Sequence, residues 1–189
     1  SAAVYGNGPI PMKEDRKLSP LNSYASSKCM IDKLAEKTMK EKNISIIGLR
    51  YFNVYGPKEA HKGKSASMIW QLSRTIKEKR VPRIFKDGEQ SRDFIYVKDV
   101  VSANIRAMES KERGIFNIGT GKSVTFNRII KILNEIFGTS FRPEYFDNPY
   151  NFYQNHTQAD TNLSSKILKW KSRFSIEDGI KDYFPSIKI

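Results

Sequence analysis

Short apolar runs that alternate with amphipathic segments constrain the fold of this chain most strongly. Ile44–Phe52 is an apolar run of strand length, and such a run is typical of a central parallel strand buried on both faces. Gly114–Ile118 reads as a second short strand, whereas Ser23 to about Lys42 and Val100–Met108 show helical spacing. Strands that alternate with helices predict an α/β fold with a parallel sheet.

The rest of the chain continues this alternation. Ala66–Lys79 places its apolar residues on one helical face. Another amphipathic helix is expected to begin at Ser123 or Thr125 and to end at Gly138. Two short helices close the chain, the second capped by Ser175. The remaining segments are expected to be extended: Ser1–Tyr5, Arg83–Phe85, Arg92–Val97 and Phe141–Phe146. A hairpin or tight loop is expected at Asp87-Gly88, between the second and third of them.

Composition argues against several classes of protein. No stretch approaches the roughly 20 apolar residues of a membrane span. The net charge of +13 comes from Lys residues scattered through every segment, which indicates a solvated basic surface and not a nucleic-acid site. Cys29 is the only cysteine, so a reducing cytoplasm is the default, and we expect it to be a buried small hydrophobe. No Cys, His or Asp cluster has metal-ligand spacing, so no metal is predicted.

Tyr24 and Lys28 form the first candidate catalytic pair. They are four residues apart on an expected helix, so both side chains lie on the same face. A phenol is a poor base at neutral pH, and a neighbouring ammonium stabilises the phenolate. A tyrosine that removes a proton from a sugar hydroxyl needs this arrangement. The spacing alone is common on amphipathic helices and therefore carries little weight.

Four further segments surround this pair in a fixed order. They are Ser1–Gly6 upstream and, downstream, Arg50–Pro57, Arg92–Val100 and Phe116–Gly121. Together with the pair they resemble the extended short-chain dehydrogenase/reductase family, in its NAD(P)-dependent epimerase/dehydratase branch. The resemblance implies an α/β fold, the remainder of a Rossmann-type doubly wound parallel sheet plus a smaller α/β substrate-binding domain.

Two segments narrow the resemblance to one group within the branch. Tyr55–Gly63 is similar to the Tyr-Gly-Pro-Arg-Glu-x-His-Lys-Gly segment of the heptose 6-epimerases, and Tyr153–Asp160 to their Tyr-Gln-x-x-Thr-Gln-Ala-Asp. Lys64 stands where that group carries a small hydroxyl residue, and Gln71 where it carries a histidine. The implied reaction is NADP-dependent inversion at C6 of an ADP-glycero-manno-heptose, which supplies lipopolysaccharide core heptose. The two departures put substrate detail in doubt, not the redox mechanism.

The resemblance also implies roles for individual residues. Tyr24 would exchange a proton with the reacting hydroxyl, Lys28 would tune it, and Ser1 would hydrogen-bond the reacting oxygen. Lys62 would be a second acid/base for the opposite configuration, while neighbouring His61 is either part of this site or a loop histidine without a catalytic role. The cofactor, NADP or NAD, would contact Tyr24, Lys28, Val54 and Lys62, and the ADP-sugar would contact Asn53, Lys64, Arg92 and Tyr153.

The family's domain division can be carried over by position. Residues 1–56 would form the second half of the NAD(P)-binding domain, with return segments near 98–118 and 157–168. Residues 57–97, 119–156 and 169–189 would form the substrate-binding domain. No Gly-x-x-Gly-x-x-Gly turn occurs in the sequence, so we expect the first, pyrophosphate-binding half to be absent. We therefore expect an incomplete, inactive chain, and also the homo-oligomeric assembly of the family.

Two alternatives remain open at this point. One is a UDP- or GDP-sugar 4-epimerase or 4,6-dehydratase of the same branch, because the motifs at Ser1, Tyr24 and Lys28 do not exclude it. The other is a non-catalytic protein that uses the same fold to bind nucleic acid through its basic charge. An intact set of Ser1, Tyr24, Lys28 and Lys62 weighs against the second alternative.

Overall fold

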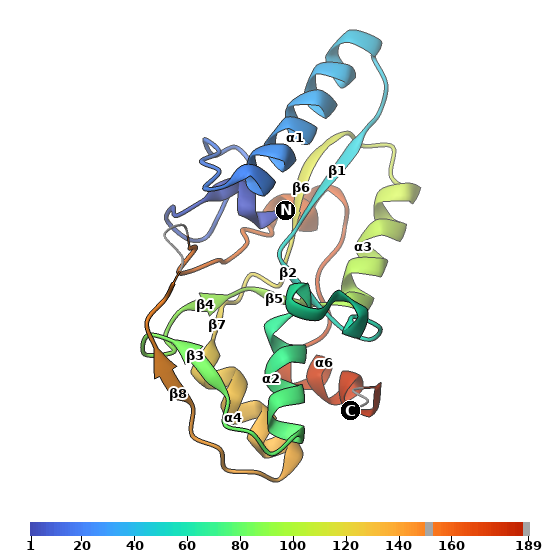
Figure 1. Ribbon diagram of the computed structural model, residues 1–189. Helices are drawn as coiled ribbons and strands as arrows, with labels where there is room; N and C mark the ends of the chain where they lie inside the picture. The colour runs from blue at the N-terminus through green and yellow to red at the C-terminus, as the bar shows by residue number, and fades with distance from the viewer. Residues whose placement is uncertain (150–152, 187–189) are drawn as a thin grey trace.

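A computed structural model describes residues 1–149 and 153–186 (Figure 1). Parts of the expected substrate-binding segments, residues 150–152 and 187–189, lie outside the described residues. The helices are η1 Ala2–Tyr5, α1 Ser23–Lys42, η2 Ala60–Ser65, α2 Met68–Lys77, α3 Val97–Glu109, α4 Phe126–Phe137, α5 Asn162–Ile167, α6 Ile176–Tyr183 and η3 Phe184–Ser186. The strands are β1 Ile47–Tyr51, β2 Asn53–Tyr55, β3 Arg83–Phe85, β4 Ser91–Arg92, β5 Phe94–Tyr96, β6 Gly114–Ile118, β7 Val124–Thr125 and β8 Glu144–Phe146.

Strand pairing confirms the expected α/β fold with parallel sheet pieces. The β1–β6, β2–β5 and β3–β8 pairs are parallel, and only β4–β7 is antiparallel among the described residues. α1 and α3 flank β1 and β6, while α2, α4 and α6 gather at the other end of the molecule (Figure 1). The described chain therefore has two ends joined by β2 and β5, and the site lies between them.

The predicted helix ends are largely confirmed because their caps form. Thr125 Oγ1 accepts a hydrogen bond from the backbone N–H of Arg128 at 3.2 Å, and Gly138 ends α4 in the left-handed region. Ser175 caps α6 in the same way. Cys29 is buried in the face of α1 that meets η1, as predicted.

The prediction that Ser1–Tyr5 ends a strand is wrong. Ala2–Tyr5 is a 3-10 helix, in which Val4 N–H donates to the Ser1 carbonyl at 3.2 Å. Val4 and Tyr5 are nevertheless buried, against Phe52 and Met12. A short buried apolar run does not distinguish a strand from a helical turn.

Of two expectations about the strands, the hairpin or tight loop at Asp87-Gly88 is confirmed as a tight turn, and the central strand buried on both faces is wrong. Asp87-Gly88 forms a tight turn, in which Gly88 N–H donates to Phe85 O at 3.1 Å, but no hairpin, because β3 pairs with the distant β8. β1 is not buried on both faces, since Arg50 is its only buried residue. Among the described residues β1 is hydrogen-bonded to β6 alone, so its other edge lacks the cover that a central strand has.

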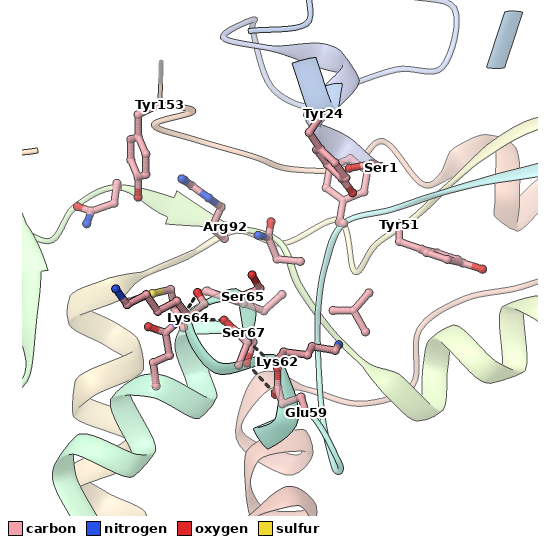
Figure 2. A pocket seen from close by; sticks show the side chains of 18 of the residues that line it. Ser1, Tyr24, Tyr51, Glu59, Lys62, Lys64, Ser65, Ser67, Arg92 and Tyr153 are labelled. Atoms are coloured by element: carbon pink, nitrogen blue, oxygen red, sulfur yellow. Dashed lines mark hydrogen bonds between the residues drawn. The ribbon is translucent and has the colours of Figure 1, made fainter. Parts of the chain in front are cut away.

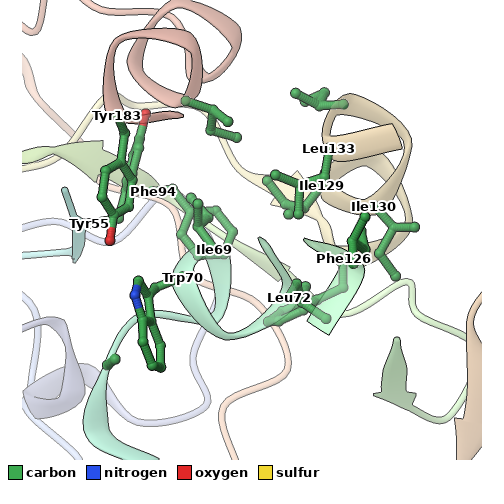
Figure 3. Close-up of a cluster of buried hydrophobic side chains, with 14 of the residues drawn as sticks. Tyr55, Ile69, Trp70, Leu72, Phe94, Phe126, Ile129, Ile130, Leu133 and Tyr183 are labelled. Carbon is green, nitrogen blue, oxygen red and sulfur yellow. The ribbon is translucent and has the colours of Figure 1, made fainter. Parts of the chain in front are cut away.

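Three clusters of buried apolar side chains hold the elements together. The largest joins α2, α4 and α6 around residues such as Ile69, Ile129 and Tyr183 (Figure 3). A second packs η1 and α1 against Phe52, and a third packs α3 and β6 around Trp170. The first cluster supports one wall of the site, and the other two support the opposite wall.

Ile129→Ala is expected to destabilise the protein by about 2–5 kcal/mol. Ile129 is fully buried on α4 within the largest cluster, so the substitution removes apolar contacts and leaves a cavity. Urea unfolding followed by circular dichroism measures the change. Ile105→Ala on α3 is the matched control, because Ile105 is 50% exposed and should cost well under half as much.

Candidate active site

One cavity of about 1400 Å³ opens between the two ends of the molecule (Figure 2). Its walls come from η1, α1, β1, β2, the η2 segment, α2 and the strands that follow. All nine residues predicted from the sequence to act in catalysis or binding line it: Ser1, Tyr24, Lys28, Asn53, Val54, Lys62, Lys64, Arg92 and Tyr153. Residues that are up to 152 positions apart in the chain are thus brought to one space.

Tyr24 and Lys28 lie in the first two turns of α1. The Asn22 side chain caps this helix, with its Oδ1 accepting from Ala25 N–H at 2.8 Å. Lys28 Nζ lies 5.3 Å from the centre of the Tyr24 ring, so the ammonium and the phenol face the same part of the cavity. Tyr24 is 55% exposed and points into the cavity beside Ser1 (Figure 2). The phenol is therefore accessible to a ligand.

A buried polar network fixes α1 relative to η1 and β1. Arg50 on β1 donates through Nε to Asp32 on α1 at 2.9 Å and through Nη1 to the Tyr5 hydroxyl at 2.8 Å. Tyr5 in turn donates to Asn117 Oδ1 at 2.6 Å. Burial raises the pKa of Tyr5, against the opposing effect of Arg50. Asp32 follows Lys28 by one turn, so this network sets where Tyr24 and Lys28 stand over the cavity.

Lys62 lies on the opposite wall from Tyr24 (Figure 2). It belongs to η2, which has no buried residue and bends at Gly63, where φ is 53°. Lys64 follows on the same segment and also lines the cavity, whereas His61 does not. A cavity with a tyrosine on one side and a lysine on the other can exchange protons with a hydroxyl oxygen on either face of a bound sugar carbon.

Arg92 is a buried cation that lines the cavity. Its Nη1 donates to the carbonyls of Ser91 and Asn155, both at 2.9 Å, and its guanidinium lies 4.8 Å from the Tyr153 ring. Burial lowers the pKa of Arg92, and Tyr153 partly opposes this effect. These partners are neutral groups, so an anion entering the cavity would supply the missing opposite charge. A phosphate oxygen fits this chemistry.

Asp93 links the backbone segments next to Arg92. It is fully buried, and its carboxylate accepts from the backbone N–H groups of Thr120, Gly121 and Ala159 at 2.8–3.0 Å. The Asp93 carbonyl accepts from Asn53 N–H at 3.0 Å. The Thr120 and Gly121 amides are thus occupied inside the protein and are not free to hold a pyrophosphate. A Cβ at Gly119 would meet the Ala159 Cβ at 2.6 Å, which explains the glycine.

Several residues that line the cavity were not predicted from the sequence. Phe85 and Phe146 meet with ring centres 4.8 Å apart, and Phe85 also contacts Tyr153 at 5.5 Å. These aromatic residues read as ordinary strand residues, because nothing in the sequence pairs β3 with β8. Glu59 was also missed, although a charged residue between Gly56-Pro57 and a Lys-rich segment was a usable signal. Glu59 is 4% exposed and lines the cavity.

Residues 1–149 and 153–186 contain no group of three or more His, Cys, Asp or Glu side chains placed to hold a metal ion. Over the same residues, no helix combines the length and apolar character needed to cross a membrane.

Comparison with known protein families assigns the chain. The model of the NAD dependent epimerase/dehydratase family matches residues 1–119, which carry Ser1, Tyr24, Lys28 and Lys62. The chain belongs to this family. The membership confirms the resemblance found in the sequence and the Rossmann-type α/β fold that it implied.

Individual relatives of this epimerase family member cover nearly all of the chain. The ADP-L-glycero-D-manno-heptose-6-epimerase of Brachyspira hyodysenteriae is 41% identical over 97% of this chain and 60% of the relative. The crystal structure of the Helicobacter pylori enzyme of the same name superposes with a TM-score of 0.90 at 38% identity, over 99% of this chain and 57% of that one. The chain thus spans about 60% of the length of the curated relatives it matches.

A second group of family structures matches equally well in shape. The UDP-glucose 4-epimerase of Thermotoga maritima, solved with UDP-glucose, has a TM-score of 0.91 at 32% identity, over 98% of this chain and 60% of that one. Backbone similarity therefore does not separate the sugar specificities within the epimerase family, and side chains in the cavity must do so.

Proposed function

We propose that the full-length protein is a nucleotide-sugar epimerase that inverts C6 of an ADP-glycero-manno-heptose with NADP. One observation carries the proposal: Tyr24 with Lys28 lies on one side of the cavity and Lys62 on the other, and the buried Arg92 lines the same cavity. The names of the curated relatives at 35–41% identity favour the heptose over other sugars. NADP is preferred over NAD on the same resemblance, although the family description names NAD.

The residues of this chain fit one end of the cofactor. Tyr24, Lys28 and Val54 line the cavity together, and a phenol, an ammonium and an apolar side chain suit the nicotinamide ribose and ring. NADP, when bound, would accept a hydride from the sugar carbon and give it back. The pyrophosphate requires donors from a glycine-rich turn, which this sequence does not contain.

The proposed proton steps use two side chains in turn. The Tyr24 hydroxyl oxygen takes the proton of the C6 hydroxyl, and the Lys28 ammonium stabilises the resulting phenolate. The oxidised sugar then reorients in the cavity. Lys62 Nζ, on the opposite wall from Tyr24, returns a proton to the same oxygen. Two groups are needed because the hydroxyl points in opposite directions in substrate and product. Ser1 Oγ would hydrogen-bond the reacting oxygen.

The remaining lining residues would hold the substrate. Arg92, with Tyr153 beside its guanidinium, would bind the diphosphate, while Asn53 and Lys64 would contact the sugar. We retain the division into a nucleotide-binding part, residues 1–56 with 98–118 and 157–168, and a substrate-binding part. Exposed apolar residues on α1 outside the cavity lining, namely Met30 and Leu34, favour burial in a homo-oligomer.

A UDP-sugar 4-epimerase is the second candidate, favoured by the fold match to the Thermotoga maritima enzyme. Incubating the full-length protein separately with the two ADP-heptose epimers and with UDP-galactose decides between them. Conversion of either heptose epimer to the equilibrium mixture is expected. Conversion of UDP-galactose alone would overturn the heptose assignment and establish the second candidate.

The 189-residue chain by itself is expected to bind NADP no tighter than millimolar and to show no turnover. The physical reason is the absence of a glycine-rich pyrophosphate turn and the use of the Thr120 and Gly121 amides by Asp93. Isothermal titration with NADP measures the affinity. Fusing the chain to the part of the Brachyspira hyodysenteriae relative that it does not cover is the positive control, and micromolar binding by the chain alone would contradict the expectation.

A further inference from the structure

The segment that carries Lys62 and Lys64 has little apolar packing to hold it. None of the residues of η2, Ala60–Ser65, is buried, and a Cβ at Gly63 would touch nothing within 4 Å. Segments with few buried contacts open locally at low cost in free energy. Acid/base catalysis needs the proton-transfer atom within hydrogen-bond reach of the substrate. Something other than hydrophobic burial must therefore fix Lys62.

Glu59 connects the two ends of this segment. Its Oε1 accepts from Gly56 N–H at 3.2 Å, before the segment, and from the Ser67 hydroxyl at 2.8 Å, after it. Its Oε2 accepts from Ser67 N–H at 2.6 Å. The dashed contacts between Glu59 and Ser67 lie directly beneath Lys62 in Figure 2. One buried carboxylate therefore closes the loop from Gly56 to Ser67.

Two further contacts strengthen this closure. The Tyr183 hydroxyl, whose pKa is raised first by burial and then by the nearby Glu59 charge, hydrogen-bonds to the same carboxylate. Lys62 N–H donates to the Glu59 carbonyl at 3.0 Å. Glu59 therefore binds the Lys62 backbone through its carbonyl oxygen. Its carboxylate binds the two ends of the loop, Gly56 and Ser67. A buried carboxylate held by four neutral donors is costly unless all of them are engaged.

We propose that Glu59 is a positioning residue that holds the Lys62 amine where proton transfer requires it. The inference rests on the proposed function for the role of Lys62, but the ordering of the loop does not depend on it. Glu59→Gln should disturb this arrangement, because it replaces one accepting oxygen with an NH₂ group. That group is itself a donor and would face the N–H and O–H donors that now bind the carboxylate. A misplacement of about 1 Å can cost on the order of 10²-fold in rate.

The test is a double-mutant cycle in the full-length protein. Glu59→Gln is expected to lower kcat by about 10–100-fold with little change in KM. In a Lys62→Met background it should lower the residual kcat less than about two-fold, because Lys62 no longer contributes. A merely structural residue would lower kcat equally in both backgrounds, and that result would overturn the proposal. Glu112→Gln, at an exposed carboxylate, is the matched control and should change neither parameter.

Hydrogen–deuterium exchange without substrate gives a readout that is independent of activity. Glu59→Gln should accelerate exchange of the amides from residue 60 to residue 66 and leave those of α4 unchanged. Unchanged exchange in the loop would refute the positioning role even if no nucleotide sugar were converted. If Glu59→Gln does not fold, Tyr183→Phe removes one donor to the carboxylate and keeps the ring, and the same local acceleration and the same non-additivity with Lys62→Met are expected. Global acceleration in that variant would also refute the proposal.

Discussion

Tyr24→Phe is expected to lower the turnover of the full-length protein by about 10²–10⁴-fold. The substitution removes only the hydroxyl that would take the sugar proton and leaves the ring in place. Tyr24 is 55% exposed to the cavity, so the change should cost little stability. Lys28, 5.3 Å from the ring centre, would then have no phenolate to stabilise. Steady-state assays with each ADP-heptose epimer measure the loss.

Binding measurements separate chemistry from folding in this variant. The affinity for NADP and the thermal unfolding midpoint should both stay close to the wild-type values. Tyr145→Phe provides the matched control, because Tyr145 lies outside the cavity lining and loses only a surface hydrogen bond to Asn127. Wild-type turnover in Tyr24→Phe would remove Tyr24 from the proton-transfer step and with it the proposed mechanism.

Lys62→Met is expected to reduce turnover by a comparable factor, about 10²–10⁴. Methionine keeps the length and the apolar stem of the side chain but has no proton to give. Because Lys62 faces the cavity from the wall opposite Tyr24 (Figure 2), the loss should appear in kcat for both epimers. Each direction of an epimerisation uses both groups. KM should change far less than kcat.

Lys62→Arg distinguishes acid/base chemistry from phosphate binding. Arginine keeps the positive charge but holds its proton at any assay pH. An acid/base role predicts that Lys62→Arg is as impaired as Lys62→Met, whereas a phosphate contact predicts substantial recovery. Lys58→Met, at an exposed position outside the cavity lining, controls for the loss of a charge nearby. Near-wild-type turnover in Lys62→Met would reduce Lys62 to a substrate contact.

The sequence by itself determined the elements that depend on local patterns. The amphipathic spacing of α2 and α4 and the capping residues Thr125 and Ser175 act within a few residues of one another, so they were visible along the chain. The resemblance to the family also predicted nine residues that line the cavity. A family motif identifies such residues because it names residue types that already lie together in space in other members. The Ser1–Tyr5 error arose where local pattern is ambiguous: a buried apolar run fits a helical turn as well as a strand.

Only the tertiary structure decided which distant segments meet. The pairing of β3 with β8 brings Phe85 and Phe146 together into the cavity wall, and the expectation of a hairpin or tight loop at Asp87-Gly88 did not include this pairing. Glu59 and Asp93 were unremarkable acidic residues until burial surrounded their carboxylates with backbone and hydroxyl donors. Hydrogen bonds of this kind depend on the position of groups contributed by other segments. Tertiary contacts, and not local propensity, therefore set the geometry of the site.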